Sequence, residues 1–344
     1  MSNIKTCLDK ISLNGMRFMF VSLVLILASQ ITQAAAINKE QHSSGKVYHF
    51  YVITKSNSSP YWLAVNAGAE AAAHKLGNVK ITAEAPPGQT DLAQQISMVN
   101  NAVTSGADGI LLAAQQAKPL SRPVADAEKK GVPVVTVDSG VSPNTADSYI
   151  ATDNVAAAAA LADVGAKANH GAGAYAIVTM DLTSVTGRSR FKGFRAEMKS
   201  KFPAYKYKGV QIAHDSVGKG RSQAAAYLES DPDINLIYGE DDLAAVSIAQ
   251  AVKAAGKEKS VFVAGFDVDA GALALIKEHA IDASIVQMPY KMGYQGVLRL
   301  VAIKNGKSVP KSTPTAFFIL TPQNVHTAKA ITAIRQYIPN YAKK

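Results

Sequence analysis

Short apolar runs alternate with longer segments in which apolar residues recur at helical spacing, and this alternation begins at Val47. The runs are apolar on both faces, which is typical of parallel strands buried inside a sheet. Between them, residues such as Leu92, Ile96 and Val99 lie on one helical face. The first series of expected strands covers residues 47–53, 80–83, 109–113, 134–137 and 148–152.

A second series of the same kind follows a break at Asp153-Asn154, where an Ala-rich helix is expected to run to Ala168. Its expected strands cover residues 175–180, 210–213, 236–238, 261–264 and 283–286, with a last helix near 294–305 and a last strand at 317–320. Each series is a strand–helix array of similar size. The pattern therefore predicts an α/β fold with two doubly wound parallel-sheet (Rossmann-like) lobes, and 344 residues suit two domains.

The first 36 residues have the pattern of a secretory signal segment. Basic residues, among them Lys5 and Arg17, precede an apolar stretch at 18–28, and small residues suitable for cleavage follow at 34–36. A stretch of 11 apolar residues is shorter than the roughly 20 that span a bilayer. We therefore expect residues 1–36 to direct export to the periplasm and to be removed, with Met16 as an alternative start of translation.

The formal net charge is +10, but no run of five or more basic residues occurs. Scattered basic residues indicate a solvated surface, so a nucleic-acid partner is not expected. The only cysteine, Cys7, lies in the signal segment. The mature chain is therefore expected to contain no disulfide and no metal bound by cysteine.

Signatures of common enzyme sites are absent, including HExxH, GxSxG, the phosphate-binding P-loop and CxxC. The Gly-rich stretch 170–174 precedes an expected strand, whereas a dinucleotide-binding fingerprint follows one. The seven histidines are dispersed, without metal-ligand spacing. We therefore expect a protein that is not an enzyme and that uses no metal and no cofactor.

Polar residues stand where the expected strands end, in both series. Ligands of open α/β sheets bind beyond the carboxyl ends of the strands, so we expect these side chains to surround one polar ligand. The aromatic pair Tyr61 and Trp62 begins the first helix, and flat rings with polar neighbours suit a sugar or polyol. The alternatives are helix capping for each aspartate and burial in the core for the two aromatic residues. The remaining candidates are Lys55, Asn57, Gln115, Asp138, Arg188, Asp241, Asp267 and Gln287.

From residue 46 to about 330 the chain resembles the ribose-type periplasmic sugar-binding proteins of ABC transporters, which are type I periplasmic binding proteins. The motifs are weak singly, but in this order, behind a signal segment, they are specific. They are Ser59-Pro60-Tyr61-Trp62, Asp108-Gly109-Ile110, the run 132–140 ending in Asp138-Ser139-Gly140, Ala151-Thr152-Asp153-Asn154, Ala264-Gly265-Phe266-Asp267, and Gln287-Met288-Pro289 followed by Met292-Gly293.

The resemblance implies roles for individual residues. In the family, an aromatic pair at Tyr61 and Trp62 lines the sugar ring, and an Asp at Asp138 takes ring hydroxyls. An Arg at Arg188 bonds the ring oxygen from the second lobe. The family also has Asn-Asp at 241–242, Phe-Asp at 266–267 and Gln at 287.

The resemblance also implies a hinge of three chain crossings between the lobes, near residues 151–152, 287–288 and 313–316. The N-terminal lobe would comprise residues 46–151 plus 289–313, and the C-terminal lobe residues 152–287 plus 314–335. Two lobes joined by such a hinge can close on a ligand bound between them.

Three departures from the family argue that the ligand is not ribose. Asp241 replaces the usual Asn, Lys55 occupies a position where small polar residues are common, and residues 215–216 lack an aromatic found in the ribose proteins. The ligand could be another pentose or hexose, a polyol such as an inositol, or a sugar with an amine that Asp241 could pair.

The predicted function is that of a periplasmic substrate-binding protein of an ABC importer, a monomer that delivers a monosaccharide or polyol to a membrane permease. The same fold could instead serve a chemoreceptor or sensor kinase. A secreted carbohydrate-active enzyme using Asp138 and Asp267 as an acid/base pair is a further alternative. A sugar-responsive transcription regulator is not favoured, because a signal segment stands where a DNA-binding domain would precede Val47.

Overall fold

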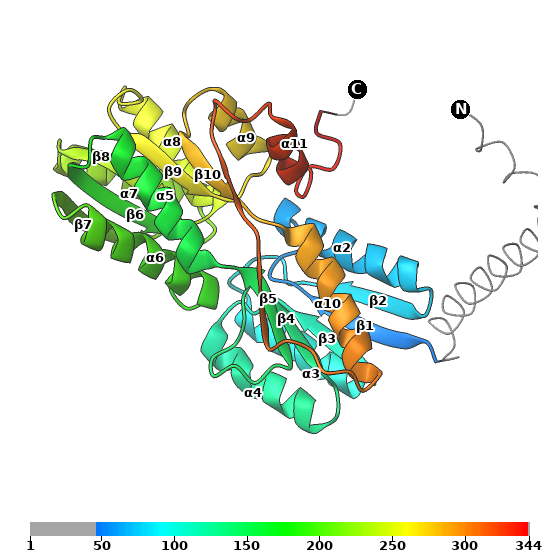
Figure 1. The fold of residues 1–344 in the computed structure, drawn as a ribbon. Coiled ribbons are helices and arrows are strands. Elements are labelled where there is room, and N and C mark those ends of the chain that lie inside the picture. The colour runs from blue at the N-terminus through cyan, green and yellow to red at the C-terminus, as the bar shows by residue number, and fades with distance from the viewer. Residues whose placement is uncertain (1–45, 343–344) are drawn as a thin grey trace, which may run out of the picture. The chain divides into compact units, whose positions relative to one another are not determined.

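The computed structural model describes residues 46–342. The predicted signal segment at 1–36 lies outside the described residues. Two six-stranded sheets with flanking helices make up the described chain (Figure 1). The predicted α/β class with two doubly wound lobes is confirmed.

The first sheet has the strand order β11-β5-β4-β3-β1-β2 and is parallel throughout. Strands β3 and β4 are completely buried, which explains why the sequence shows continuous apolar runs there. The strands are β1 (Tyr48–Ile53), β2 (Val79–Glu84), β3 (Gly109–Leu112), β4 (Val134–Val137), β5 (Ser148–Thr152) and β11 (Ser312–Thr315), and the helices of this lobe are α2 (Pro60–Leu76), α3 (Leu92–Thr104), α4 (Ala117–Lys129) and α10 (Pro289–Lys304).

The second sheet has the order β12-β10-β9-β8-β6-β7, and only its edge strand β12 is antiparallel. The strands are β6 (Gly173–Thr179), β7 (Tyr205–Ile212), β8 (Ile234–Gly239), β9 (Phe262–Phe266), β10 (Ala283–Val286) and β12 (Phe318–Leu320), and the helices are α5 (Asn154–Ala168), α6 (Val185–Lys201), α7 (Val217–Ser230), α8 (Asp242–Ala254), α9 (Ala270–Lys277) and α11 (Ala328–Ile334). Each lobe therefore has its own core, and the core of the second packs α5 and α6 against the sheet.

The chain passes between the two sheets three times. The first passage joins β5 to α5 at 152–154, and the second joins β10 to α10 at 286–289. The third lies between β11 and β12, at 315–318, because residues 312–315 still pair with β5 of the first sheet. The expected passages were 151–152, 287–288 and 313–316, so the third begins two residues later than the expected lobe boundary. The short polar strand β11 carries no apolar pattern that could have revealed it.

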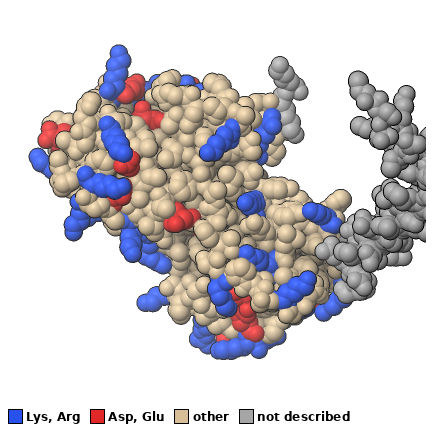
Figure 2. Space-filling view, viewed as in Figure 1, with Lys and Arg blue, Asp and Glu red and all other residues tan. Residues whose placement is uncertain are grey.

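On the face drawn in Figure 2, Lys and Arg are spread over the lobes with Asp and Glu among them. Within residues 46–342, no helix is long and apolar enough to cross a membrane.

Helices α2 and α10 lie side by side in the first lobe (Figure 1) and approach each other backbone to backbone. A Cβ atom at Gly68 would lie 1.9 Å from the Tyr290 carbonyl oxygen, and one at Gly293 would lie 1.9 Å from the Val65 carbonyl oxygen. Only glycine allows this reciprocal contact, because a real Cβ would force the helices apart.

Gly68→Ala should therefore lower the free energy of unfolding by about 1–3 kcal/mol, the usual cost of overpacking. Gly218→Ala is the matched control, because a Cβ at that position of α7 meets nothing within 4 Å. The control should be neutral or more stable by up to about 1 kcal/mol. Urea denaturation measures both, and equal stabilities would contradict the close helix contact.

Candidate functional site

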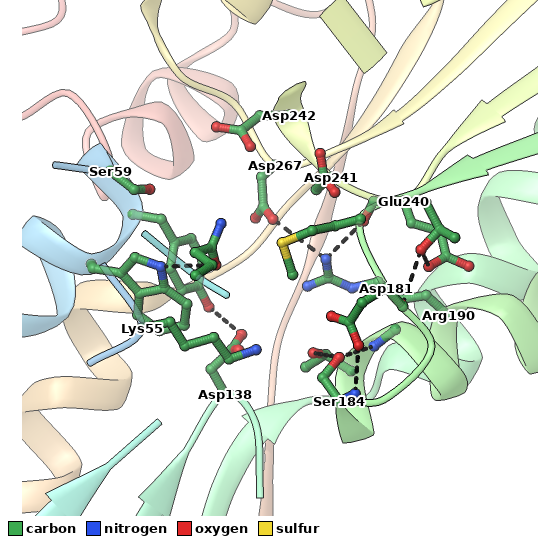
Figure 3. A pocket seen from close by; sticks show the side chains of 17 residues that line it. Lys55, Ser59, Asp138, Asp181, Ser184, Arg190, Glu240, Asp241, Asp242 and Asp267 are labelled. Atoms are coloured by element: carbon green, nitrogen blue, oxygen red, sulfur yellow. Dashed lines mark hydrogen bonds and ion pairs between the residues drawn. The ribbon is translucent and has the colours of Figure 1, made fainter. Parts of the chain in front are cut away.

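A cavity lies between the carboxyl ends of the strands of the two sheets. It contains about 490 Å³ of space not filled by protein atoms, part of it open to solvent. Figure 3 shows Lys55, Ser59 and Asp138 of the first lobe on one side and Asp181, Glu240 and Arg190 of the second on the other. The other lining residues are Tyr61, Trp62, Gln89, Thr179, Met180, Ser184, Thr186, Gly187, Asp241, Asp242 and Asp267.

Asp138, directly after β4, is the central acceptor of the first wall. It is 3% exposed, and its Oδ1 accepts a hydrogen bond of 2.7 Å from the Tyr61 hydroxyl. Its φ is +59°, in the left-handed region, and the Tyr149 hydroxyl braces this turn by donating to the Asp138 carbonyl oxygen at 2.8 Å. Backbone strain of this kind persists where the surroundings enforce it and is concentrated at functional sites.

Asp267, directly after β9, is the counterpart of Asp138 in the second lobe, with φ +70°. Its Oδ1 accepts hydrogen bonds from the Tyr337 hydroxyl at 2.6 Å and from Gln287 Nε2 at 2.7 Å. Its Oδ2 lies 3.6 Å from Arg190 Nη1. Burial raises the pKa of Asp267 above its ordinary value, and the Arg190 charge opposes that shift.

Arg190 of α6 is the buried cation of the second wall. Its Nε donates to Asn154 Oδ1 and its Nη1 to the Glu240 carbonyl oxygen, each at 2.8 Å, and the guanidinium lies 3.7 Å over the Phe266 ring. Burial alone would lower the pKa of Arg190, but the carboxylates of Asp267 and Asp138 raise it above its ordinary value. Arg190 is therefore charged and fixed in orientation.

The sequence prediction named Arg188 as the ligand-binding arginine, but the arginine that lines the cavity is Arg190. Arg188 is exposed, and its Nη1 donates to the Thr183 carbonyl oxygen at 2.7 Å. It lines a separate groove with Lys192. Side chains two positions apart on a helix point about 200° away from each other. Arg188 and Arg190 therefore lie on opposite faces of α6, and only Arg190 lines the cavity.

Lys55 and the aromatic pair lie together on the first wall. The rings of Tyr61 and Trp62 contact each other edge to face, with 4.7 Å between the ring centres. Trp62 Nε1 donates to Gln89 Oε1 at 3.3 Å. Lys55 Nζ lies 5.7 Å from the centre of the Trp62 ring. Burial lowers the pKa of Lys55, while Asp138 and Asp181 oppose the shift.

Three other predicted residues do not line the cavity. Asn57 is exposed, with its backbone N–H on the Pro86 carbonyl oxygen. Gln115 is buried and holds the first loop, since its Nε2 donates to the carbonyl oxygens of Lys55 and Gly88. Gln287 is fully buried behind Asp267.

Gln287 also connects the cavity with the three passages between the lobes. Its Oε1 accepts a hydrogen bond of 2.6 Å from Thr152 Oγ1, at the first passage. Thr152 Oγ1 in turn lies 3.4 Å from Thr315 Oγ1, at the third. One hydrogen-bond cluster therefore joins all three passages to Asp267.

Asp241 both lines the cavity and caps α8, so the two interpretations left open by the sequence hold together. Its Oδ1 accepts a hydrogen bond of 2.7 Å from the Ala244 N–H, and burial raises its pKa to about 6. Helix α9 is capped by Asp269 rather than by Asp267. Sequence reasoning missed Gln89, Asp181 and Glu240 as lining residues, although Glu240 directly precedes Asp241.

The metal-ligating residue types do not converge on an ion-binding arrangement. Among residues 46–342, no group of three or more His, Cys, Asp or Glu could hold a metal ion. The lining residues are instead hydrogen-bond acceptors, two cations and two aromatic rings. Such a set can hold a polar ligand by donor and acceptor geometry.

Residues 50–308 match the family model of the periplasmic binding protein domain. Because this match covers more than half of the chain, the protein belongs to the periplasmic binding protein family. The chain is similar to the ribose import binding protein of Bacillus subtilis, with 28% identity over 85% of this chain and 95% of that protein. It is also similar to the D-allose-binding periplasmic protein of Escherichia coli, with 29% identity over 76% of this chain and 86% of that protein.

Solved structures show the same likeness. A carbohydrate transporter solute-binding protein from Agrobacterium radiobacter, solved with D-arabinose, has a TM-score of 0.81 and 29% identity, covering 85% of this chain and 100% of that one. An ABC transporter solute-binding protein from Agrobacterium vitis, solved with D-fucose, has a TM-score of 0.78 and 28% identity, covering 82% and 98%. These relatives are binding proteins of transport systems rather than enzymes.

Tyr337→Phe removes the hydroxyl that donates to Asp267 and accepts from the Gln287 backbone N–H at 3.0 Å. Leaving such buried groups with one partner fewer costs about 1–3 kcal/mol, and we expect the free energy of unfolding to fall by that amount. Tyr290→Phe is the control, because Tyr290 is 37% exposed, and its change should stay within about 0.5 kcal/mol. Equal urea midpoints for the two variants would show that the network does not support the fold.

Proposed function

We propose that this protein binds a monosaccharide or polyol in the cavity between its lobes and delivers it to the membrane permease of an ABC importer. The observation that carries the proposal is that Asp138 and Arg190 lie on opposite walls of one cavity, which the ring of Tyr61 also lines. A carboxylate accepts ligand hydroxyls and a guanidinium donates to ligand oxygens. The sugars bound by the relatives offer both.

Closure of the lobes follows from the same arrangement. Asp138 belongs to the first lobe and Arg190 to the second, so a ligand that touches both stabilises the closed state more than the open one. The chain would act in the periplasm, because the predicted signal segment directs export. No step of the proposed function changes the ligand chemically.

The direct test is a titration of the exported and processed protein with D-ribose, D-allose, D-arabinose, D-fucose, D-glucose and myo-inositol. Trp62 is the only tryptophan, so its fluorescence reports on the cavity wall, and calorimetry gives the affinity. We expect saturable binding of at least one compound, which chromatography should recover unchanged. A folded protein that binds neither these compounds nor amino sugars or amino polyols, or a ligand that is converted, would refute the proposal.

Arg190 and Arg188 form a matched pair for locating the site. Arg190→Gln should weaken binding at least about a hundredfold, because a charged hydrogen-bond donor is lost from a buried site. Arg188→Gln should change the dissociation constant less than about threefold, because Arg188 faces away from the cavity. Calorimetry with the best ligand of the panel measures both, after circular dichroism confirms folding. A larger effect at Arg188 would move the site to its groove.

Binding should also depend on pH through Asp241. Its pKa is raised to about 6 by burial, and hydroxyls donate to the ionised carboxylate. Protonation of the free protein below pH 6 therefore competes with the ligand, and affinity should fall up to about tenfold between pH 7 and pH 5. In Asp241→Asn the fall should disappear. An unchanged fall in that variant would assign the titration to another carboxyl.

A further inference from the structure

The cavity contains more acidic groups than cations. Six carboxyl groups line it, those of Asp138, Asp181, Glu240, Asp241, Asp242 and Asp267, against the two cations Lys55 and Arg190. Five of the six belong to the second lobe, where Arg190 is the only lining cation (Figure 3). The formal excess of negative charge therefore lies on the wall of the second lobe.

Few ion pairs offset this formal excess. Arg190 is within ion-pair distance of Asp267 alone, at 3.6 Å. Among the described residues, no ion pair within 4 Å involves the other four carboxyl groups of that wall. Lys55 lies over the Trp62 ring instead of pairing with a carboxylate.

Among the described residues, Asp181, Asp241 and Asp242 each use one carboxyl oxygen for a hydrogen bond within the protein and leave the other without one. Asp181 Oδ1 accepts from the backbone N–H groups of Thr183 and Ser184, and Asp241 Oδ1 accepts from Ala244. In both cases Oδ2 has no hydrogen bond within the described part of the chain. The wall therefore presents acceptors to a bound molecule without having to break internal bonds.

Glu240 gives an independent indication of an absent partner. It is 2% exposed and lines the cavity, yet its Oε1 has no hydrogen-bond partner among the described residues. Its other oxygen, Oε2, accepts from the Thr179 hydroxyl. Burial raises the pKa of Glu240 well above its ordinary value, and a cation beside this carboxyl group would oppose that shift.

The ligand chemistry can be narrowed by charge. The acidic wall of the second lobe would repel an anion. Within residues 46–342, no group of three or more His, Cys, Asp or Glu residues could hold a metal ion. A neutral sugar supplies donors but leaves the charge excess in place. An ammonium group supplies three donors together with the compensating charge.

We propose that the ligand is a sugar or polyol bearing a protonated primary amine, held against the free oxygens of Asp181, Glu240 and Asp241. This inference rests on the proposed function, because the ligand's hydroxyls are still placed by Asp138 and Arg190. The amine is the group that the second lobe selects. We expect Asp241 to determine this selectivity, because its Oδ1 is used by the Ala244 N–H and its Oδ2 is left for the ligand.

The test compares amines with their hydroxyl and acetylated counterparts. D-Glucosamine is titrated against D-glucose and N-acetyl-D-glucosamine, D-galactosamine against D-galactose, and 1-amino-1-deoxy-D-glucitol against D-glucitol, by calorimetry at pH 7. We expect at least one amine to bind ten or more times more tightly than its hydroxyl counterpart. Acetylation, which removes the charge, should abolish the advantage.

Asp241→Asn and Asp233→Asn form a matched pair at opposite ends of β8. Asp233 is exposed, so Asp233→Asn should leave the amine-to-hydroxyl affinity ratio within twofold. Asp241→Asn should reduce that ratio at least fivefold. A ratio that stays the same in Asp241→Asn would overturn the assignment of Asp241.

The outcomes separate this inference from the proposed function. If neutral sugars bind as tightly as, or more tightly than, every amine, the amine inference is wrong and the sugar-binding function stands. If the folded protein binds no member of either class, including the neutral panel of pentoses and hexoses, both are wrong. Tight binding of the amines alone would support both.

Discussion

The rest of the site depends on the hydrogen bonds and the ion pair made by the buried carboxylate of Asp267. A buried carboxylate is unfavourable unless it is paired and hydrogen-bonded. Here Tyr337, Gln287 and Arg190 meet that requirement from three different segments of the chain. Satisfying one acidic group thus fixes the orientation of the cation that faces the cavity.

The same group would connect ligand binding with the proposed lobe motion. Gln287 reaches from Asp267 to Thr152, and Thr152 lies beside Thr315, so every passage between the lobes belongs to the cluster. A ligand that shifts Asp267 would therefore change the hydrogen bonds at these passages. No long chain of intermediate contacts is needed between the site and the hinge.

The sequence was sufficient for the architecture because buried parallel strands have a strong apolar pattern, and because strand ends converge wherever the sheet is parallel. That reasoning placed Asp138, Asp241 and Asp267 at strand ends. It failed at Arg188 because the phase of α6 decides which arginine faces inward. Helix α6 begins at Val185 after the Ser184 cap, and its phase places Arg190 on the cavity side.

Other parts of the site depend on contacts that no local pattern encodes. Gln89 was not predicted, yet it accepts from Trp62 and donates to Asp215 of the other lobe at 2.9 and 3.1 Å. Gln115 and Gln287 were predicted as ligand contacts because they follow strands, but tertiary packing places them behind the cavity wall. Strand ends therefore identify the region of the site, and side-chain packing decides which residues reach it.

Ligand-driven closure is the central claim, and a distance between the lobes tests it most directly. The processed chain has no cysteine of its own, so Ser97→Cys on α3 and Ser222→Cys on α7, both exposed, accept one spin label each. These helices follow Gln89 and Asp215, which meet across the cleft. Pulsed electron paramagnetic resonance should show a broad or longer distance without ligand, and one shorter distance at saturation with the tightest-binding sugar or amino sugar. Identical distance distributions in the two states would contradict the account.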